Sequence, residues 1–386
     1  MVEYIKTVLE RKARVVKKIL AVIMLLAIVL PVLAGCKKDE TYDPVPSTEE
    51  ESRVIMTLSY GERSYEVKYE LYRALFLNMK DEVSGGDDSV WTGSEKEEYI
   101  DRINGLIIER ISDIYSVFAI ADQLGIDLYS DGVDKQIKAY VKESVEGGDS
   151  VEGYGSYSKY LAALKQMNLN YSVQDLLLRY QIGLEKIETH YVGAFNSEAV
   201  SETVKFGDRT YTKDDILSYY LSDECVRTLR AEINPALYYE EDLLARIERV
   251  KSGMSAAAAG GEESVAIYIV GSGSSAQSEK DTEFILGRYS LHRLYFSEFI
   301  DAAFALREGG ISEPIDVSTD SGRAVYIVYR AEKTALSFEE SYADIVSVFL
   351  ADMLGRIIYN ANTELKANAS FTETYSEIIH SEISMN

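Results

Sequence analysis

The chain has 386 residues, of which 64 are acidic and 40 are basic, so its net charge at neutral pH is −24. Nucleic-acid binding requires clustered lysine and arginine, and this acidic balance argues against a nucleic-acid partner. The apolar fraction of 46% is ample for packed cores, and the length suggests two or three domains. The three histidines are far apart and show no metal-ligand spacing, so neither a metal nor another cofactor is expected.

The first 35 residues have the pattern of an export signal. Six basic residues precede an apolar run over residues 19–30, and small residues stand directly before Cys36. The run is shorter than the roughly 20 apolar residues that a membrane-spanning helix needs. We therefore expect cleavage before Cys36 and a lipid on its thiol, which would anchor the protein to the extracytoplasmic face of the cell membrane. An uncleaved N-terminal anchor is the alternative.

The mature chain is more acidic than the precursor. Without residues 1–35 it keeps 34 basic and 62 acidic residues, a net charge of −28, which argues against lying flat on an anionic bilayer. Residues 37–52 are charged, contain proline and serine, and have no apolar period. With Cys36 they predict a flexible tether between the membrane and the folded body.

The first part of the body is predicted to be mainly helical. Residues 54–67 read as a β-hairpin with a turn at Gly61. Ser94 and Glu97 stand at capping-box spacing before a long helix that ends at Gly125. One stripe of this helix is apolar at helical spacing and includes Ile103, Ile107, Ile111 and Ile114. Further helices are expected over about 69–83, 130–146, 156–167 and 172–193.

A weak internal repeat links two parts of the chain. Tyr60-Gly-Glu-Arg-Ser-Tyr65 is similar to Phe206-Gly-Asp-Arg-Thr-Tyr211, and each copy leads into a tyrosine-rich helix. Thr212 and Asp215 have capping-box spacing in the second copy. The shared unit is predicted to be strand, tight turn, strand and helix start, with a coincidence of turn chemistry as the alternative.

From Arg227 onwards the pattern is mixed α/β. Strands are predicted at 227–233, 265–270 and 324–330, and a helix at about 239–252. Ser337 and Glu340 are predicted to cap a long C-terminal helix with an apolar face.

Three stretches of this region resemble the parvulin peptidyl-prolyl isomerases. The sequence from Phe299 to Ile315, FIDAAFALREGGISEPI, is similar to the family's short helix followed by a turn and a strand. Thr319-Asp-Ser-Gly322 with Tyr326-Ile-Val-Tyr-Arg330 resembles its closing strand, and Val226-Arg-Thr-Leu-Arg-Ala-Glu-Ile233 resembles its entry strand. Together with the export signal, the order of segments resembles the PrsA/SurA foldases.

The resemblance implies an α+β fold, in which a helical chaperone lobe built from N- and C-terminal segments carries an inserted parvulin-like α/β domain. The parts it implies are a signal peptide at 1–35, a tether at 36–52, a helical domain at 53–222, a parvulin-like domain at 223–334 and a C-terminal helix at 335–386 that packs on the helical lobe.

The resemblance also places a candidate site. The family's two histidine positions fall on or near Glu232 and on Tyr326, with the second uncertain by a residue or two. A tyrosine cannot replace a pair of mutually tuned imidazoles, so weak or absent isomerase activity is expected. Phe299, with Leu291 and Tyr295, stands on the side of the proline pocket and is expected to bind peptide. Apolar residues at helical spacing also commonly fill a core, which is the alternative.

Three functions are compatible with these features. The first is a membrane-anchored foldase or chaperone that binds unfolded exported polypeptides, and a homodimer is compatible with it. The second is an active isomerase with a non-standard polar set, and the third, ranked lowest, is a solute-binding lipoprotein with two α/β lobes. Cys225 is read as a small buried apolar residue rather than a nucleophile, and His292 as an ordinary surface histidine.

Overall fold

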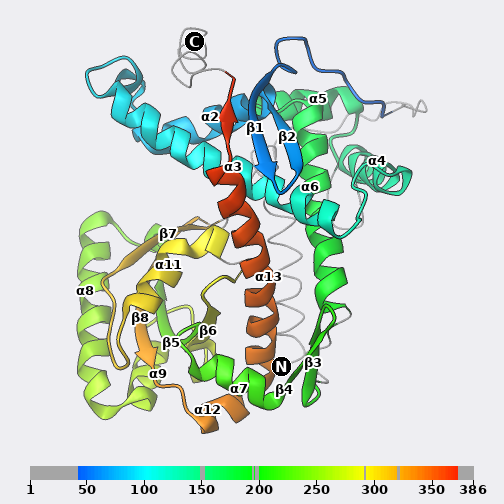
Figure 1. Ribbon diagram of the computed structural model, residues 1–386. Coiled ribbons are helices and arrows are strands. Elements are labelled where there is room, and N and C mark those ends of the chain that lie inside the picture. The colour runs from blue at the N-terminus through cyan, green and yellow to red at the C-terminus, as the bar shows by residue number, and fades with distance from the viewer. Residues whose placement is uncertain are drawn as a thin grey trace. The chain divides into compact units, whose positions relative to one another are not determined.

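The computed structural model describes residues 42–147, 153–193, 195, 200–290, 293–319 and 322–372 and confirms the predicted α+β class (Figure 1). The chain divides into two compact units. The helical unit contains the described residues up to Thr189 and from Ile358 onwards, and the sheet unit spans His190–Ile357. The predicted limits at 222 and 335 both fall inside the sheet unit, because this unit also includes residues 190–222 and most of the last long helix.

The helical unit combines helices with a small antiparallel sheet of order β2-β1-β9. Its elements are β1 (Val54–Tyr60), β2 (Arg63–Lys68), α2 (Tyr69–Ser84), the 3-10 helix η1 (Asp88–Trp91), α3 (Lys96–Gln123), α4 (Asp131–Glu146), α5 (Tyr157–Gln166), α6 (Tyr171–Val192), the end of α13 (Tyr342–Ala367) and β9 (Ser370–Phe371).

Helix α3 is the centre of the helical unit. The predicted stripe is buried, with Ile103, Ile107, Ile111 and Ile114 at most 1% exposed. Its start differs from the prediction, because Glu95 is the N-cap residue and makes no side-chain cap, so Ser94 and Glu97 form no capping box there.

Helices α3 and α6 approach closely at Gly183. A Cβ atom built on Gly183 would lie 2.6 Å from Val117 Cγ1 and 3.0 Å from Leu128 Cδ1. A contact below 3.0 Å requires one of the groups to move, so a hydrogen atom is the largest substituent that this crossing accepts.

Residues 42–52, expected as part of the tether, make specific contacts in the helical unit. Ser47 donates a hydrogen bond to the buried Glu70 carboxylate at 2.5 Å, alongside Asn170 and Ser172 at 2.7 and 2.6 Å. The Tyr157 hydroxyl donates to the Asp43 carbonyl at 2.7 Å. Because a buried carboxylate needs hydrogen-bond donors, Glu70 fixes the course of this segment.

The sheet unit contains a four-stranded antiparallel sheet of order β6-β5-β8-β7 and a separate β3-β4 hairpin. Its elements are β3 (Thr203–Phe206), β4 (Arg209–Thr212), α7 (Lys213–Leu221), β5 (Cys225–Ile233), η3 (Pro235–Leu237), α8 (Glu240–Ala257), η4 (Ala258–Gly260), α9 (Glu262–Gly271), α10 (Glu279–Thr282), β6 (Glu283–Gly287), α11 (Arg293–Ala305), β7 (Ile315–Thr319), β8 (Gly322–Ala331), α12 (Ala335–Glu340) and most of α13.

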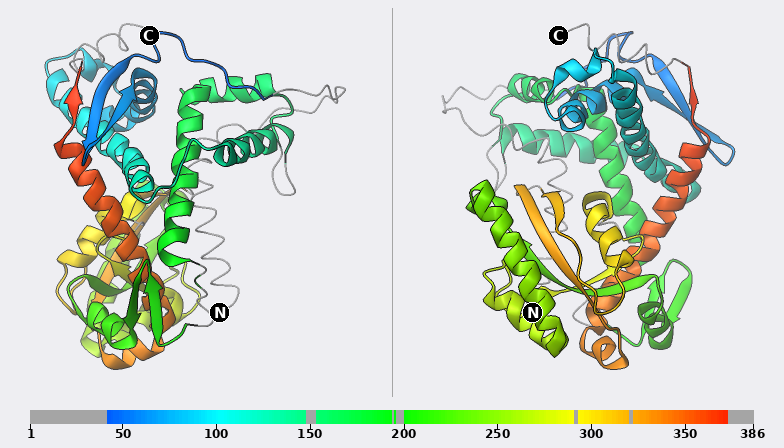
Figure 2. Two further views of the ribbon diagram at one scale, coloured as in Figure 1. Left: turned by 45° about the vertical axis from the view of Figure 1, so that its right-hand side comes forward. Right: turned by 90° about the vertical axis from the view of Figure 1, so that its left-hand side faces the viewer.

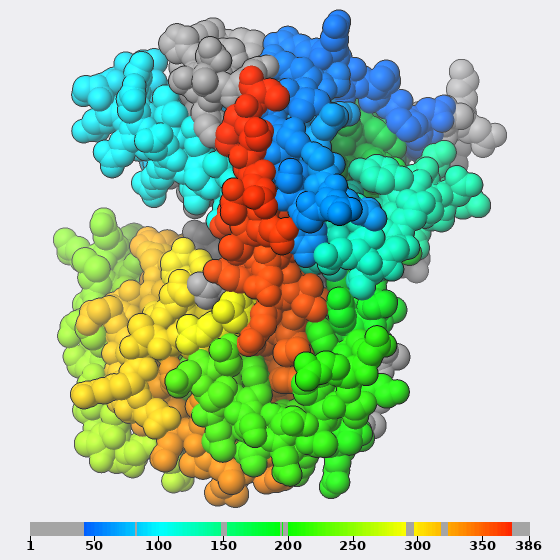
Figure 3. Space-filling view, in the orientation of Figure 1, coloured from blue at the N-terminus to red at the C-terminus, as the bar shows by residue number. Residues whose placement is uncertain are grey.

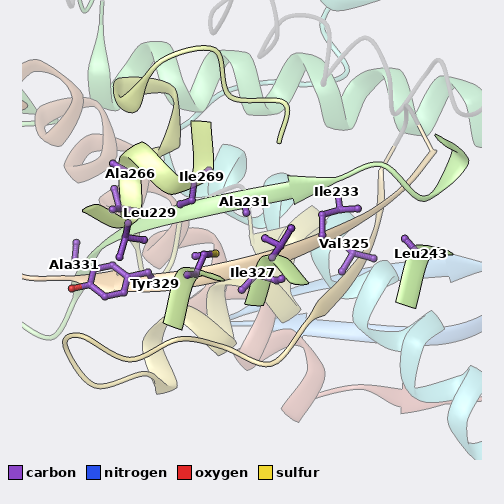
Figure 4. Packing of buried hydrophobic residues seen from close by; sticks show 13 residues of the cluster. Leu229, Ala231, Ile233, Leu243, Ala266, Ile269, Val325, Ile327, Tyr329 and Ala331 are labelled. Atoms are coloured by element: carbon purple, nitrogen blue, oxygen red, sulfur yellow. The ribbon is translucent and has the colours of Figure 1, made fainter. Parts of the chain in front are cut away.

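Two apolar cores lie on opposite faces of the four-stranded sheet. In Figure 2, strands β7 and β8 run between the α8–α9 pair and α11. Side chains of β5, such as Leu229 and Ala231, meet those of β8, such as Ile327, under α9 in the first core (Figure 4). The second core packs α11 residues such as Phe299 against Val226 and the strands of the opposite face. Successive side chains along each strand point to opposite faces of the sheet, so each strand contributes to both cores.

Two local predictions in this unit are wrong. Residues 265–270 form part of helix α9 rather than a strand, because Val265, Ala266 and Ile269 recur at helical spacing and pack onto the sheet. A short apolar run cannot be assigned from periodicity alone. The sheet instead receives β6, where no strand was predicted. The cap at Ser337 is also displaced, because Thr334 begins the short helix α12 and Ser337 is its third residue.

The two copies of the internal repeat have the same local structure. Each forms a hairpin with a glycine at φ +57°, Gly61 in one and Gly207 in the other, and leads directly into a helix. In the second copy Thr212 and Asp215 form the predicted capping box. The repeat therefore reflects a real structural unit of strand, turn, strand and helix start.

Helix α13 is held in the sheet unit by a buried carboxylate. The Asp352 side chain is 0% exposed and accepts a hydrogen bond from the Tyr289 N–H at 2.5 Å. The backbone following β6 approaches the helix so closely that a Cβ atom on Gly355 would lie 1.5 Å from the Tyr289 carbonyl oxygen. In Figure 3 the orange part of α13 is flanked by the green segment that carries β4, and Tyr211 contacts Phe349 there.

The first prediction concerns the crossing at Gly183. Gly183→Ala should lower the free energy of unfolding by about 1–3 kcal/mol, because the added methyl overlaps Val117. Gly105 is an exposed glycine in α3, and no atom lies within 4 Å of the position that an added methyl would occupy, so Gly105→Ala should be neutral or stabilising by up to about 1 kcal/mol. Urea unfolding of both variants measures the difference, and equal effects would contradict the close approach.

The second prediction concerns Asp352. Burial raises the pKa of its carboxyl to about 6, against the opposing effects of the Tyr289 N–H and Arg356. When the pKa of a carboxyl is higher in the folded than in the unfolded state, its protonated form stabilises the fold. This contribution to the free energy of unfolding is complete below about pH 4 and is lost as the pH rises through 6. One pKa unit corresponds to about 1.4 kcal/mol. The free energy of unfolding of Asp352→Asn should therefore exceed that of the parent by up to about 3 kcal/mol at pH 8, and the two should become equal near pH 4.

Denaturant unfolding between pH 4 and pH 8 checks the sign of this effect. Asp214→Asn, which removes an exposed charge from α7 in the same unit, is the matched control for the change in net charge. An advantage of Asp352→Asn that grows towards low pH would show that the carboxylate is stabilised, not penalised, by its surroundings.

Candidate functional site

The pairing of β5 with β8 sets the geometry of the candidate site. Glu232 lies directly opposite Tyr326, and Arg230 lies opposite Val328. Partners across an antiparallel pair point to the same face, and Tyr326 and Val328 belong to the core beneath α11. The structure therefore brings the two predicted residues Glu232 and Tyr326 together as cross-strand neighbours on the α11 face.

Three aromatic rings from three elements meet on this face. Phe299 of α11 makes edge contacts with Tyr326 of β8 at 5.4 Å and with Phe284 of β6 at 6.0 Å between ring centroids. Such edge-to-face pairs add to the energy of apolar burial. Phe299 is 2% exposed and Tyr326 is 5% exposed, so both rings are part of the core, whereas Phe284 is half-buried.

The other two predicted peptide-binding residues are only partly covered by the structure. Leu291 lies outside the described residues, and so does His292. Tyr295 falls in helix α11, where only its backbone is described. The predicted grouping of Leu291 and Tyr295 with Phe299 therefore stays a prediction.

Arg230 is the residue of this face that the sequence interpretation missed. Its guanidinium carbon lies 4.1 Å from the centroid of the Phe284 ring and 5.5 Å from that of Tyr326. These are cation–π distances, in which the planar guanidinium is attracted to the negative ring face. The period of two from Glu232 could have placed Arg230 on the same face, but its stacking partner on β6 was not predicted.

The helix that covers the site is fixed by a second arginine. Arg330, at the end of β8, is buried and donates a hydrogen bond from Nη1 to the carbonyl oxygen of Ala303 at 2.9 Å. The same nitrogen lies 3.4 Å from the carbonyl of Leu306. Carbonyl groups at a helix C-terminus lack intrahelical partners, and Arg330 satisfies them. Burial lowers the pKa of Arg330.

The polar groups of this face suit binding better than proton transfer. Arg230 supplies fixed hydrogen-bond donors, Tyr326 a phenol and Glu232 a carboxylate. The backbone N–H of Glu232 donates to Ser274 Oγ at 3.0 Å. The only histidine in the described part of the chain, His190, lies on α6 and not on this sheet. An arginine with aromatic neighbours can hold carbonyl or carboxylate oxygens against an apolar surface.

Other sites suggested by the sequence have these outcomes. Cys225 is 0% exposed, and burial raises the pKa of its thiol to about 12, which agrees with a structural rather than a nucleophilic cysteine. Cys36 lies outside the described residues.

Among the described helices, none has the length and apolar character needed to cross a bilayer. Within the same ranges no three histidine, cysteine or acidic side chains gather around a point that could hold a metal ion.

A surface cavity of about 370 Å³ lies elsewhere in the sheet unit. It is formed by η3 and the first turns of α8, including Leu237, Tyr239 and Arg246. None of the predicted site residues lines it, so it is separate from the aromatic face described above.

Comparisons with known proteins give structural neighbours only. No protein-family model matches the chain, and no curated protein matches it in sequence. Among solved structures, the foldase protein PrsA from Streptococcus pneumoniae is 16% identical, with 80% of this chain and 94% of that chain covered and a TM-score of 0.28. PrsA from Lactococcus lactis is 13% identical, with coverages of 86% and 99% and a TM-score of 0.23. PrsA from Bacillus subtilis is 15% identical, with coverages of 70% and 87% and a TM-score of 0.22. At these values no residue role is transferred from those proteins.

Proposed function

We propose that this protein is a membrane-anchored extracytoplasmic foldase or chaperone, which binds unfolded exported polypeptides and has little or no prolyl isomerase activity. One observation carries the proposal. Of the three stretches that resemble the parvulin family, the first lies about 65 residues before the other two, yet all three form neighbouring parts of one sheet unit. They are β5, the α11–β7 segment and β8, with β8 paired to both β5 and β7.

The residues on the α11 face support binding rather than catalysis. The positions where the resemblance implies histidines hold Glu232 and Tyr326, and Arg230 lies beside them. A histidine titrates near neutral pH, whereas an arginine stays charged, so this set lacks a tuned pair of imidazoles. Phe299 keeps the apolar character expected of a proline pocket, although it is packed into the core.

Exposed apolar side chains support transient contacts with unfolded chains. In the helical unit Tyr129 is 65% exposed and Leu106 is 42% exposed. In the sheet unit Leu237, Tyr239 and Leu244 are more than 60% exposed around the start of α8. Binding of unfolded polypeptide to such surfaces would lower its free concentration and so oppose aggregation.

The anchor would hold this binding body where exported chains emerge. The lipobox-like sequence before Cys36 supports lipidation, and the mature net charge of −28 supports a body that stays off the anionic membrane surface. Of the predicted tether, residues 42–52 contact the helical unit.

An active isomerase is the second candidate function. It is favoured by the combination of a cation, a phenol and an apolar ring on one face, formed by Arg230, Tyr326 and Phe299. Hydrogen bonds to the twisted amide could lower part of its barrier of about 18–20 kcal/mol. A solute-binding lipoprotein ranks below both, because the helical unit has only the small β2-β1-β9 sheet and not an α/β lobe.

The third prediction tests foldase against isomerase. The full chain carrying Cys36→Ser should suppress aggregation of an unfolded model protein near equal molar ratio and give little turnover in a protease-coupled assay on proline peptides. A folded protein of similar net charge is the control for non-specific effects. Inactivity in both assays would contradict the proposal.

Turnover in the second assay would favour the isomerase, provided that it depends on the α11 face. Phe299→Ala should abolish such turnover, but the loss of a buried ring also costs about 3–5 kcal/mol of stability. Tyr326→Phe keeps the ring and removes the hydroxyl, so it separates loss of chemistry from loss of folding. Turnover that both variants retain would point to a contaminant.

The fourth prediction concerns the anchor. In a bacterial host with a lipoprotein pathway, the parent should partition into membranes and incorporate a labelled fatty acid. Cys36→Ser should lose the label and leave the membrane fraction after signal cleavage, whereas Cys225→Ser should keep both properties. Equal labelling of the parent and Cys36→Ser would contradict lipidation at this residue.

A further inference from the structure

Arg230 is held by aromatic rings, whereas three other arginines of the sheet unit are held in ion pairs. Arg227 pairs with Glu262 and Glu283, Arg323 with Asp316, and Arg356 with Glu224. Within the described ranges no carboxylate lies within 4.0 Å of the Arg230 guanidinium, although Glu232 is on the same strand face. In a chain with 64 acidic residues, this guanidinium is held by aromatic rings.

The contacts of Arg230 leave its donors available to a ligand. The guanidinium carbon lies 4.1 Å from the centroid of the Phe284 ring, and among the described residues none accepts a hydrogen bond from its N–H groups. These groups form a fork that matches the two oxygens of a carboxylate. Arg230 and Phe284 are both half-buried, so a ligand reaching them would contact a cation and an apolar ring at once.

We propose that Arg230 is a specificity-determining residue, which selects client segments that carry an aspartate or glutamate side chain next to an apolar residue. The inference rests on the proposed client-binding function and names its preferred substrate class. The carboxylate would bind the Arg230 fork, and the neighbouring apolar group would contact the exposed part of the Phe284 ring. Charge complementarity at this point favours acidic segments even though the protein as a whole is acidic.

The partner chemistry follows from the hydrogen bonds that would be formed. A charge-assisted bond with two parallel N–H···O contacts is stronger than a neutral one, and it is partly shielded from water here. An amide of the same shape can accept only through one oxygen and carries no charge. A glutamate segment should therefore bind about tenfold or more tightly than its glutamine counterpart, and high salt should reduce that ratio.

Three matched peptides test the proposal by isothermal titration or fluorescence anisotropy, with the full chain carrying Cys36→Ser. The first has Glu-Pro-Phe at its centre with both ends blocked, the second has Gln-Pro-Phe, and the third has Gln-Pro-Phe with a free C-terminal carboxylate. We expect the first to bind about tenfold or more tightly than the second. Arg230→Gln should remove the difference, and Arg230→Lys should retain part of it as a point charge.

Arg323→Gln is the matched control, because Arg323 lies on β8 in the same unit but is exposed and paired with Asp316. It should leave the peptide preference unchanged. Melting temperatures of all variants show whether each is folded. Equal binding of the first two peptides would overturn the role of Arg230 while leaving the foldase proposal intact. Tighter binding of the third peptide alone would assign the site to chain ends, also overturning it. Failure of every peptide to bind would overturn both proposals.

Discussion

The register of β5 against β8 is the constraint on which the rest of the sheet unit depends. With Glu232 opposite Tyr326, the residues that alternate along β5 separate into two sets. Leu229, Ala231 and Ile233 pack under α8 and α9, whereas Val226 packs under α11. A slip of one residue would exchange the two faces, place Arg230 in an apolar core and break the contact with Phe284. Both apolar cores therefore enforce the same register.

Much of the fold could be predicted from the sequence because its signals are local. Helices α2, α4, α5 and α6 lie close to their predicted ranges, since their apolar spacing is strong. The two hairpin turns at Gly61 and Gly207 were also predictable, because each needs a positive φ.

The errors arise where tertiary packing decides between local alternatives. The apolar run at 265–270 fits both a strand and a buried helix, and its packing against the sheet makes it part of α9. Strand β6 is too short to be recognised alone and exists because β5 offers it a free edge. The caps at Ser94 and Ser337 failed because a spacing of three residues also occurs by chance, and neither serine is the N-cap residue.

The candidate site was predictable only in outline. The resemblance placed Glu232 and Tyr326 on two strands, and the structure makes them neighbours. Arg230 was missed because its role depends on Phe284, which comes from the unpredicted strand β6. Phe299 illustrates the opposite case, since the same residue fills the core and forms the apolar side of the proposed binding face. Phe299 is 2% exposed and therefore part of the core, and its contact with a peptide stays a prediction.

The central claim is that the α11 face of the sheet is the preferred contact surface for client polypeptide. Site-specific photo-cross-linking tests it most directly, with a benzophenone amino acid placed at Glu232 or at Ile267. Glu232 is half-buried beside Tyr326, whereas Ile267 is 54% exposed on α9, the helix that covers the opposite face. The account predicts that an unfolded client is cross-linked from position 232 and much less from position 267. Cross-linking from position 267 alone, or equally from both positions, would contradict it.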